Sequence, residues 1–119
     1  MPIGVKSVYE ELGAEDGYRV LVDEYWPQHK SKSRLKIDAW MKEIAPSEAA
    51  RRWWGHRPAR WEEFRDRYRR ELTQPHRQAL VDELVRRARR GPVTLVLGRR
   101  ETQLSNATVI AEVVQEQLP

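Results

Sequence analysis

Two polar stretches of this sequence hold the residue types that could bind an anion or move a proton. Asp23 directly follows an apolar run, and Arg99 and Arg100 follow another shortly before Ser105. Guanidinium groups bind phosphate and carboxylate, and so do the free N–H groups at the start of a helix. Asp23 could pair with Arg100, orient a sugar hydroxyl or act as a base. The candidate ligand-binding residues are Asp23, Trp26, Arg99, Arg100, Glu101, Ser105 and Asn106.

Each of these residues also has a purely structural interpretation. Asp23 could end a strand and pair with an arginine, and Ser105 could serve only as the N-cap of a helix. Trp26 lies in a loop between Tyr25 and Pro27, where it could form a platform for a ligand. No glycine-rich phosphate fingerprint accompanies these residues. The ligand class we expect is an anionic small molecule, nucleotides included, and whether the site is catalytic stays open.

The three histidines do not indicate a metal centre or a catalytic triad. His29, His56 and His76 are widely spaced, and the chain has no cysteine. A metal site needs three or four converging ligands. A serine nucleophile of the hydrolase type is expected in a Gly-x-Ser-x-Gly turn, which this chain lacks. We therefore expect no metal and no cofactor, and we assign no catalytic residue.

An arginine-rich surface is the main alternative to a small-molecule site. Residues 51–100 carry fifteen arginines against six acidic side chains, a balance that favours nucleic acid as a partner. Acidic residues four positions before arginines predict the helical ion pairs Glu63–Arg67, Asp66–Arg70, Asp82–Arg86 and Glu83–Arg87. The candidate nucleic-acid contacts, which lack such partners, are Arg51, Arg52, Arg57, Arg60 and Arg77. Nucleic acid is the less favoured partner, and a protein-interaction domain without a ligand is a third alternative.

The elements that must position these residues are strands and helices in mixed order. Apolar and β-branched patterns predict strands over residues 3–9, 18–22 and 92–97. Residues 23–36 are predicted to form a long loop, and residues 39–45 fit either a short strand or a helical turn. In open α/β sheets, ligands bind beyond the carboxyl ends of the strands. The loops that contain Asp23 and Gly98 are therefore expected to be neighbours in one cleft.

Apolar residues spaced by three and four predict the helices. They cover residues 47–54, 58–74, 76–90 and the segment from about residue 105 onward. Ser47 and Ser105 suit the N-cap position, and Gly55 and Gly91 suit helix ends. Strands near both ends of the chain predict one small Rossmann-like α/β domain over residues 1–119, with a mixed or parallel sheet flanked by helices.

The composition sets limits on the class of protein. The chain has 119 residues, a net charge of +4 and five tryptophans, which predicts one folded domain with a single core. No apolar run approaches the roughly 18 residues of a membrane helix, and the first residues lack the apolar stretch of a signal peptide. We therefore expect a cytoplasmic protein without a membrane partner. The sequence does not set its oligomeric state.

Several segments of the chain resemble the YeaO-like family, a group of small bacterial proteins classed as a domain of unknown function. The matching residues are 18–23, 26–27, 40–47, 52–56, 61–64, 68–72 and 91–95. They cover nearly the whole chain in the family's order. The resemblance implies a compact α/β domain that is Rossmann-like in appearance, and it implies no established activity.

The loops at the predicted strand ends depart from the family pattern. Residues 23–29 read Asp-Glu-Tyr-Trp-Pro-Gln-His where the family has Asp-Arg-Leu-Trp-Pro-Arg-Gly, so both arginines are replaced. Residues 97–101 read Leu-Gly-Arg-Arg-Glu in place of Tyr-Ala-Ala-Lys-Asp, and Leu104 stands at the position of a histidine. The resemblance therefore implies that a family active site at these loops is lost or altered in this chain.

Overall fold

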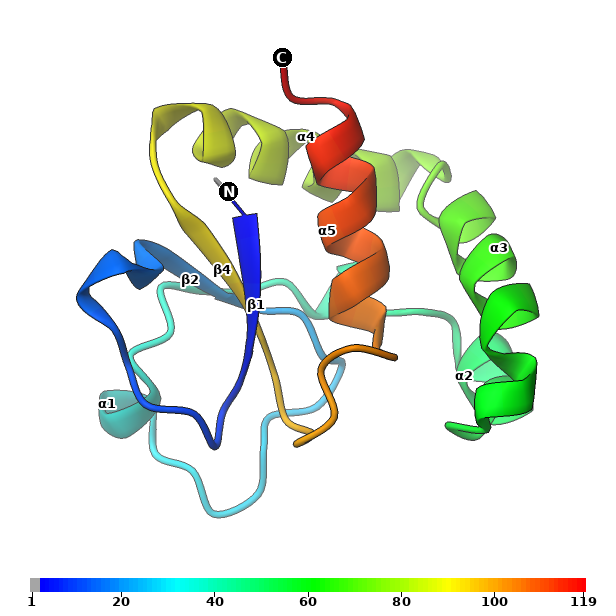
Figure 1. The fold of residues 1–119 in the computed structure, drawn as a ribbon, viewed down its shortest axis with the longest axis horizontal. Coiled ribbons are helices and arrows are strands. Elements are labelled where there is room, and N and C mark those ends of the chain that lie inside the picture. The colour runs from blue at the N-terminus through cyan, green and yellow to red at the C-terminus, as the bar shows by residue number, and fades with distance from the viewer. Residues whose placement is uncertain (1–2) are drawn as a thin grey trace.

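A four-stranded parallel sheet forms the centre of the computed structural model, which describes residues 3–119 (Figure 1). Met1 and Pro2, which begin the N-terminal stretch considered above, lie outside the described residues. The strands are β1 (Ile3–Ser7), β2 (Tyr18–Leu21), β3 (Ala39–Trp40) and β4 (Val93–Leu97). Their spatial order is β1-β4-β2-β3. An α/β fold with a parallel sheet is thus confirmed, whereas this strand order does not confirm a Rossmann-like fold.

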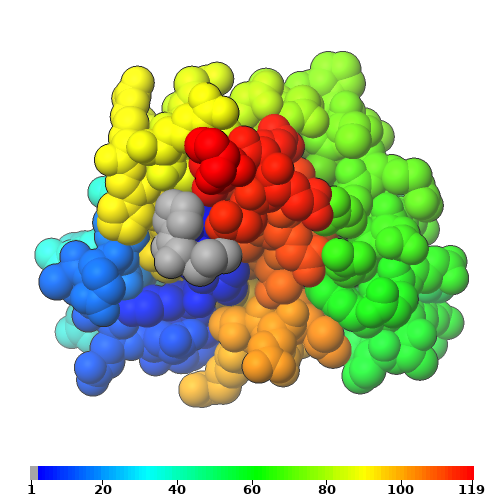
Figure 2. All heavy atoms as spheres, turned by 45° about the horizontal axis from the view of Figure 1, so that its top comes forward, coloured from blue at the N-terminus to red at the C-terminus, as the bar shows by residue number. Residues whose placement is uncertain are grey.

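Helices cover the two faces of the sheet unequally. The helices are α1 (Lys32–Leu35), α2 (Glu48–Trp54), α3 (Trp61–Glu71), α4 (Pro75–Arg90) and α5 (Asn106–Glu116). The 3-10 turns are η1 (Ala14–Asp16), η2 (Lys42–Ile44) and η3 (Pro58–Arg60). α4 and α5 pack on the sheet, and α5 in orange and red lies between the blue N-terminal strands and the green α3 (Figure 2). Within residues 3–119, no helix has the length and apolarity needed to span a bilayer.

The side chains of β2 and β4 alternate between two apolar clusters. Val20 and Leu95 belong to the larger cluster, which the long helices cover. Leu21 and Val96 belong to the smaller cluster on the other face, where Leu35 of α1 packs against them. This alternation follows from the two-residue period of a strand. A sheet with both faces covered accounts for the continuous apolar run of β4, in which every residue is buried.

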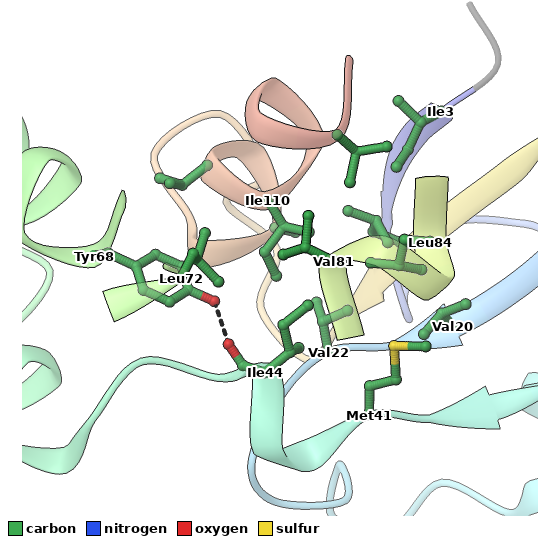
Figure 3. Close-up of a cluster of buried hydrophobic side chains, with 14 of the residues drawn as sticks. Ile3, Val20, Val22, Met41, Ile44, Tyr68, Leu72, Val81, Leu84 and Ile110 are labelled. Carbon is green, nitrogen blue, oxygen red and sulfur yellow. Dashed lines mark hydrogen bonds between the residues drawn. The ribbon is translucent and has the colours of Figure 1, made fainter. Parts of the chain in front are cut away.

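A column of aromatic side chains joins α2 to α3. Phe64 stacks on Trp54 at a ring-centroid distance of 4.4 Å, and Tyr68 lies 5.7 Å beyond Phe64. The buried Tyr68 hydroxyl donates to the Ile44 carbonyl oxygen at 2.6 Å (Figure 3). Aromatic pairs of this kind stabilise by about 0.5–1.5 kcal/mol beyond their buried area. The column therefore fixes α2, the helix that carries Arg51, against the rest of the fold.

The elements agree with the sequence-based predictions except at three places. The helix predicted over residues 58–74 is divided into η3 and α3, and residues 39–45 contain both a short strand and a 3-10 turn. The loop predicted over residues 23–36 contains α1, a single turn that is too short to show a periodic apolar pattern. Ser47 and Ser105 are N-caps, as predicted, and each accepts a backbone hydrogen bond from the third residue after it.

Two of the arginines of α3 pair with carboxylates of α5. Among residues 3–119, three of the predicted ion pairs do not form: Glu63–Arg67, Asp66–Arg70 and Asp82–Arg86. Glu83–Arg87 does form, at 3.7 Å. Arg65 and Arg69 instead share Glu112 of α5, at 2.7 and 3.4 Å. Exposed pairs along one helix contribute only about 0.3–0.5 kcal/mol, so helical spacing alone does not determine which of these ion pairs form; Arg86, for example, pairs with Glu83 at 3.3 Å.

A closed group of charges lies at the start of β2. The Asp16 carboxylate is 2.8 Å from Lys6 Nζ and 2.7 Å from Arg19 Nη1, and it accepts a hydrogen bond from Gly13 N. Arg19 Nε donates to the Leu35 carbonyl oxygen at 3.2 Å. Burial acts to raise the pKa of Asp16, but the hydrogen bonds from Lys6, Gly13 and Arg19 outweigh it, so the pKa lies below 3.8. We call these residues the Asp16–Arg19 cluster.

Candidate functional site

A cavity of about 200 Å³ lies beyond the carboxyl ends of β2 and β4, where the sequence predicts a cleft. Asp23 follows β2, Arg99 follows β4, and Asn106 is the first residue of α5. Arg51 and Trp54 of α2 also line this space. We call it the strand-end cavity. It joins three regions that lie far apart in the sequence, residues 23–25, 45–56 and 99–106.

Asp23 ties the end of β2 to the end of β4 and to α5. Its Oδ2 accepts a hydrogen bond from Gly98 N at 2.7 Å, and Asn106 Nδ2 lies 3.4 Å from its Oδ1. Asn106 also donates to the Val22 carbonyl oxygen at 3.1 Å. Burial raises the pKa of Asp23 above 3.8, although the hydrogen bonds from Gly98 and Asn106 counteract part of the rise. The two loops are therefore neighbours, as predicted, and within the described residues Asp23 forms no ion pair with Arg100.

The two arginines of the strand-end cavity have few partners of their own. Arg99 Nη1 makes a long hydrogen bond of 3.4 Å to the Leu104 carbonyl oxygen. Arg51 lies over the Tyr25 ring at 5.6 Å, and its Nη2 is 4.0 Å from the carboxylate of the exposed Glu24. A guanidinium group has five N–H donors. Among residues 3–119, most donors of both side chains therefore have no partner and are free to bind a ligand.

Trp54 and His56 complete the lining of the cavity. The Trp54 ring is buried and meets the His56 ring edge-on at a centroid distance of 4.6 Å. His56 follows Gly55 at the end of α2, and both residues have positive φ. Burial and the charges of Arg99 and Arg51 lower the pKa of His56 below 6.5, so the imidazole is neutral at neutral pH. His56 thus adds a hydrogen-bonding group and not a third cation.

Four of the seven candidate residues lie outside the lining of the strand-end cavity. Arg100 lies over the Tyr9 ring at 4.1 Å, and Glu101 accepts two backbone hydrogen bonds within its own loop. The Ser105 hydroxyl serves as the N-cap of α5. Trp26 lines an adjoining groove. The other three candidates converge on the cavity.

Most of the candidate nucleic-acid contacts are engaged within the chain. Arg51 lines the strand-end cavity. Arg52 pairs with Glu48, four residues before it, at 2.5 Å, so the expectation that it lacks a helical partner is wrong. Arg60 and Arg77 donate hydrogen bonds to backbone carbonyl oxygens. Arg57 is exposed. These arginines therefore do not form one surface of unpaired cations.

Sequence reasoning did not assign α2 to the anion site. A weak signal was present, because Arg51 and Trp54 lie three residues apart and so share one face of a helix. Ser47 and Gly55, four residues before and after Arg51, offer it no carboxylate, and Glu48, three residues before it, pairs with Arg52. An arginine beside a buried aromatic residue, with no helical partner, is a candidate for a site inside the fold. Spacing along the chain does not indicate which distant loop it meets.

The arrangement is better suited to binding an anion than to metal or nucleophilic chemistry. In residues 3–119, no group of three His, Cys, Asp or Glu side chains is placed to hold a metal ion. The Ser105 hydroxyl is occupied as a helix cap, and the Asp23 oxygens accept hydrogen bonds from the chain. What the cavity offers a ligand is a set of guanidinium donors beside an apolar wall.

The fold and the cavity define a small parallel α/β protein with a basic pocket at the strand ends. The chain belongs to the inactive DUF488-N3 subclade, which it matches over residues 2–119. It is 38% identical to an uncharacterised protein of Mycobacterium tuberculosis over 112 residues, which are 94% of this chain and 92% of the relative. It is 35% identical to the uncharacterised protein YeaO of Escherichia coli, with 94% and 96% of the two chains covered. The resemblance to the YeaO-like family is thus confirmed, and no solved structure matches the chain.

Three of the departures from the family pattern, at Glu24, Tyr25 and Arg99, fall on the strand-end cavity. Glu24 stands where the pattern has an arginine, and Arg99 stands where it has an alanine, and both line the cavity. Compared with the pattern, the cavity therefore lacks an arginine at position 24 and has an additional one at position 99. The description of the family as inactive is in line with the expectation that an active site at these loops is lost or altered.

Proposed function

We propose that this protein binds a small anionic molecule, such as a phosphate ester or a carboxylate, in the strand-end cavity. The observation that carries the proposal is that Arg51 and Arg99 both line a cavity of about 200 Å³ with most of their donors unpaired. Phosphate and carboxylate groups are the usual partners of paired guanidinium forks. The position beyond the carboxyl ends of parallel strands is where α/β proteins bind ligands.

The acidic residues of the lining do not oppose this proposal. Asp23 is held by Gly98 N and Asn106, so its oxygens are directed to the chain. Glu24 is 45% exposed and only just within 4.0 Å of Arg51. An exposed pair of this kind is worth at most about 1 kcal/mol, so an anion that enters the cavity displaces it at little cost.

Binding without turnover is the role we infer. Among the described residues of the cavity, no serine or cysteine lies beside a base, and His56 is the only imidazole in the lining. The family is described as inactive. A protein of this kind acts as a carrier, a sensor or a ligand-dependent partner of another molecule.

Thermal unfolding in the presence of inorganic phosphate tests the proposal, with chloride at matched ionic strength as the reference. Phosphate at about a hundred times its Kd should add about 2.7 kcal/mol of stability, which raises the Tm by several degrees. Arg99→Met should weaken binding about tenfold or more, because a hydrogen bond to a charged group contributes about 1.5–3 kcal/mol. Arg86→Met is the matched control, since Arg86 is 60% exposed on α4.

Three results would contradict the proposal. The first is a shift that Arg99→Met and Arg86→Met reduce equally, which would indicate a general effect of positive charge. The second is a shift with a short oligonucleotide alone that disappears with salt, as expected when a protein neutralises nucleic-acid phosphates. That second result would favour the arginine-rich surface, and the third, no shift with any anion, would favour the interaction domain.

A further inference from the structure

A second, larger groove adjoins the strand-end cavity. Its volume is about 590 Å³, and it shares Glu24, Tyr25, Ala45 and Pro46 with the lining of the cavity. Two spaces with common walls can be occupied by one ligand. The strand-end cavity alone, at about 200 Å³, is smaller than the roughly 300–1,000 Å³ of ordinary ligand pockets. A ligand whose anionic group is held by Arg51 and Arg99 can therefore extend past Tyr25 into this groove.

The groove is lined by exposed aromatic side chains, and the fold holds Trp40, which also carries Lys42 Nζ over its ring at 5.1 Å, in a fixed orientation. Tyr25 is 64% exposed and Trp40 is 38% exposed. The Trp40 indole N–H donates to the Asp23 carbonyl oxygen at 2.7 Å, and the Trp26 ring meets the Trp40 ring edge-on at 5.5 Å. Rings whose polar atoms are already bonded have fixed orientations and apolar faces. Such rings form platforms on which planar bases stack.

The charges of the groove differ from those of the strand-end cavity. Glu43 and Glu48 line it together with Lys42 and Arg77, so that acidic and basic groups are mixed. The Arg77 guanidinium is engaged by the Ala45 carbonyl oxygen. A second phosphate would meet carboxylates here, whereas the amino groups and hydroxyls of a nucleoside would find acceptors. The groove is thus matched to a neutral, hydrogen-bonding ring.

We propose that the anionic ligand of this protein is a nucleoside monophosphate, with its phosphate between Arg51 and Arg99 and its base against Trp40 and Tyr25. This inference rests on the proposed function: that function locates the anionic group of the ligand, and this inference identifies the rest of the ligand. The base supplies stacking area, and the ribose spans the common wall of the two spaces at Tyr25.

Calorimetric titration with adenosine 5′-monophosphate and with ribose 5-phosphate tests the inference. The nucleotide should bind at least about fivefold more tightly, because stacking of one base on an aromatic side chain is worth at least that factor. Trp40→Leu should bring the two affinities to within about twofold of each other without weakening ribose 5-phosphate. Tyr9→Leu, which removes an exposed aromatic ring outside both spaces, is the matched control.

The possible failures can be told apart. If both compounds bind equally tightly to the wild-type protein, the base subsite is wrong and the anion site stands. If neither binds, the proposed function itself fails. If Trp40→Leu does not fold, Tyr25→Leu takes its place, and a larger loss for the nucleotide than for ribose 5-phosphate is again required. Equal losses for the two compounds would overturn the inference.

Discussion

An aspartate and arginine side chains lie at each end of β2, but the charges are paired with one another at the start of the strand and largely unpaired at its end. At its start, Asp16 and Arg19 are 4% and 5% exposed, and Lys6 adds a second cation within 2.8 Å of the carboxylate. At its end, Asp23 is bonded to the backbone, while Arg51 and Arg99 have no carboxylate closer than 4.0 Å among the described residues. The charges at the start of β2 therefore pair with one another, whereas the arginines at its end face a cavity with most of their donors unpaired.

The difference separates charges that hold the fold together from charges that can bind a ligand. A buried ion pair with all its hydrogen bonds made is costly to break, because either partner left alone is an uncompensated buried charge. A guanidinium with unused donors beside a cavity contributes little to the fold and has donors available for another molecule. Stability and binding are therefore expected to depend on different arginines of this chain.

Breaking the Asp16–Arg19 cluster should have the largest effect on stability. Asp16→Ala leaves Arg19 buried without its carboxylate, and the free energy of unfolding should fall by about 3–5 kcal/mol. Denaturant titration followed by circular dichroism measures this loss. A decrease below about 1 kcal/mol would show that the cluster is not closed as described. Binding of phosphate by the folded fraction should be unchanged.

Changes at Asp23 should have an intermediate effect that depends on the hydrogen bond and not on the charge. Asp23→Ala removes the acceptor of Gly98 N and should cost about 1–3 kcal/mol. Asp23→Asn keeps an acceptor oxygen and removes a buried charge, so its cost should stay below about 1 kcal/mol. The same titration applies. Equal losses for the two variants would mean that the negative charge itself stabilises the strand ends.

The two carboxylates should also give opposite pH dependences. The folded-state pKa of Asp16 lies below 3.8, so its contribution is present above that pH and is lost as the pH falls through the folded-state value. The folded-state pKa of Asp23 lies above 3.8, so stability decreases as the pH rises from there through the raised value. The free energy of unfolding, measured between about pH 3 and pH 7, tests both statements. Asp16→Asn should reduce the loss of stability at low pH, and Asp23→Asn should remove the decrease in stability as the pH rises. Matching profiles for both variants would contradict the contrast.

Removing Arg51 or Arg99, the arginines that line the strand-end cavity, should have the smallest effect on stability. Arg99→Met and Arg51→Met should each change the free energy of unfolding by no more than about 0.5 kcal/mol, because neither residue completes a buried ion pair. The comparison is with Arg19→Met, which should be severely destabilised. A loss of about 2 kcal/mol or more at Arg99 would mean that it is a structural residue.

The sequence indicated the fold more fully than the site. Strand and helix patterns, with N-caps at Ser47 and Ser105, predicted the main elements, and the carboxyl-end rule predicted the contact between the loops of Asp23 and Gly98. Arg51 was predicted only as a nucleic-acid contact and not for the cavity that it lines, because no local pattern shows which distant loops α2 meets in the fold. Arg100 was assigned to the site because it neighbours Arg99, although successive side chains of an extended loop point in different directions.

The central claim is that the carboxyl end of the sheet binds an anion and the Asp16–Arg19 cluster does not. Nuclear magnetic resonance titration of labelled protein with inorganic phosphate, at constant ionic strength, tests it most directly. The account predicts saturable shifts of the Gly98, Arg99 and Asn106 amides and of the Trp54 indole N–H, with the Arg19 amide unmoved. Shifts spread over the exposed arginines of α4, or the absence of any saturable shift at the cavity, would contradict it.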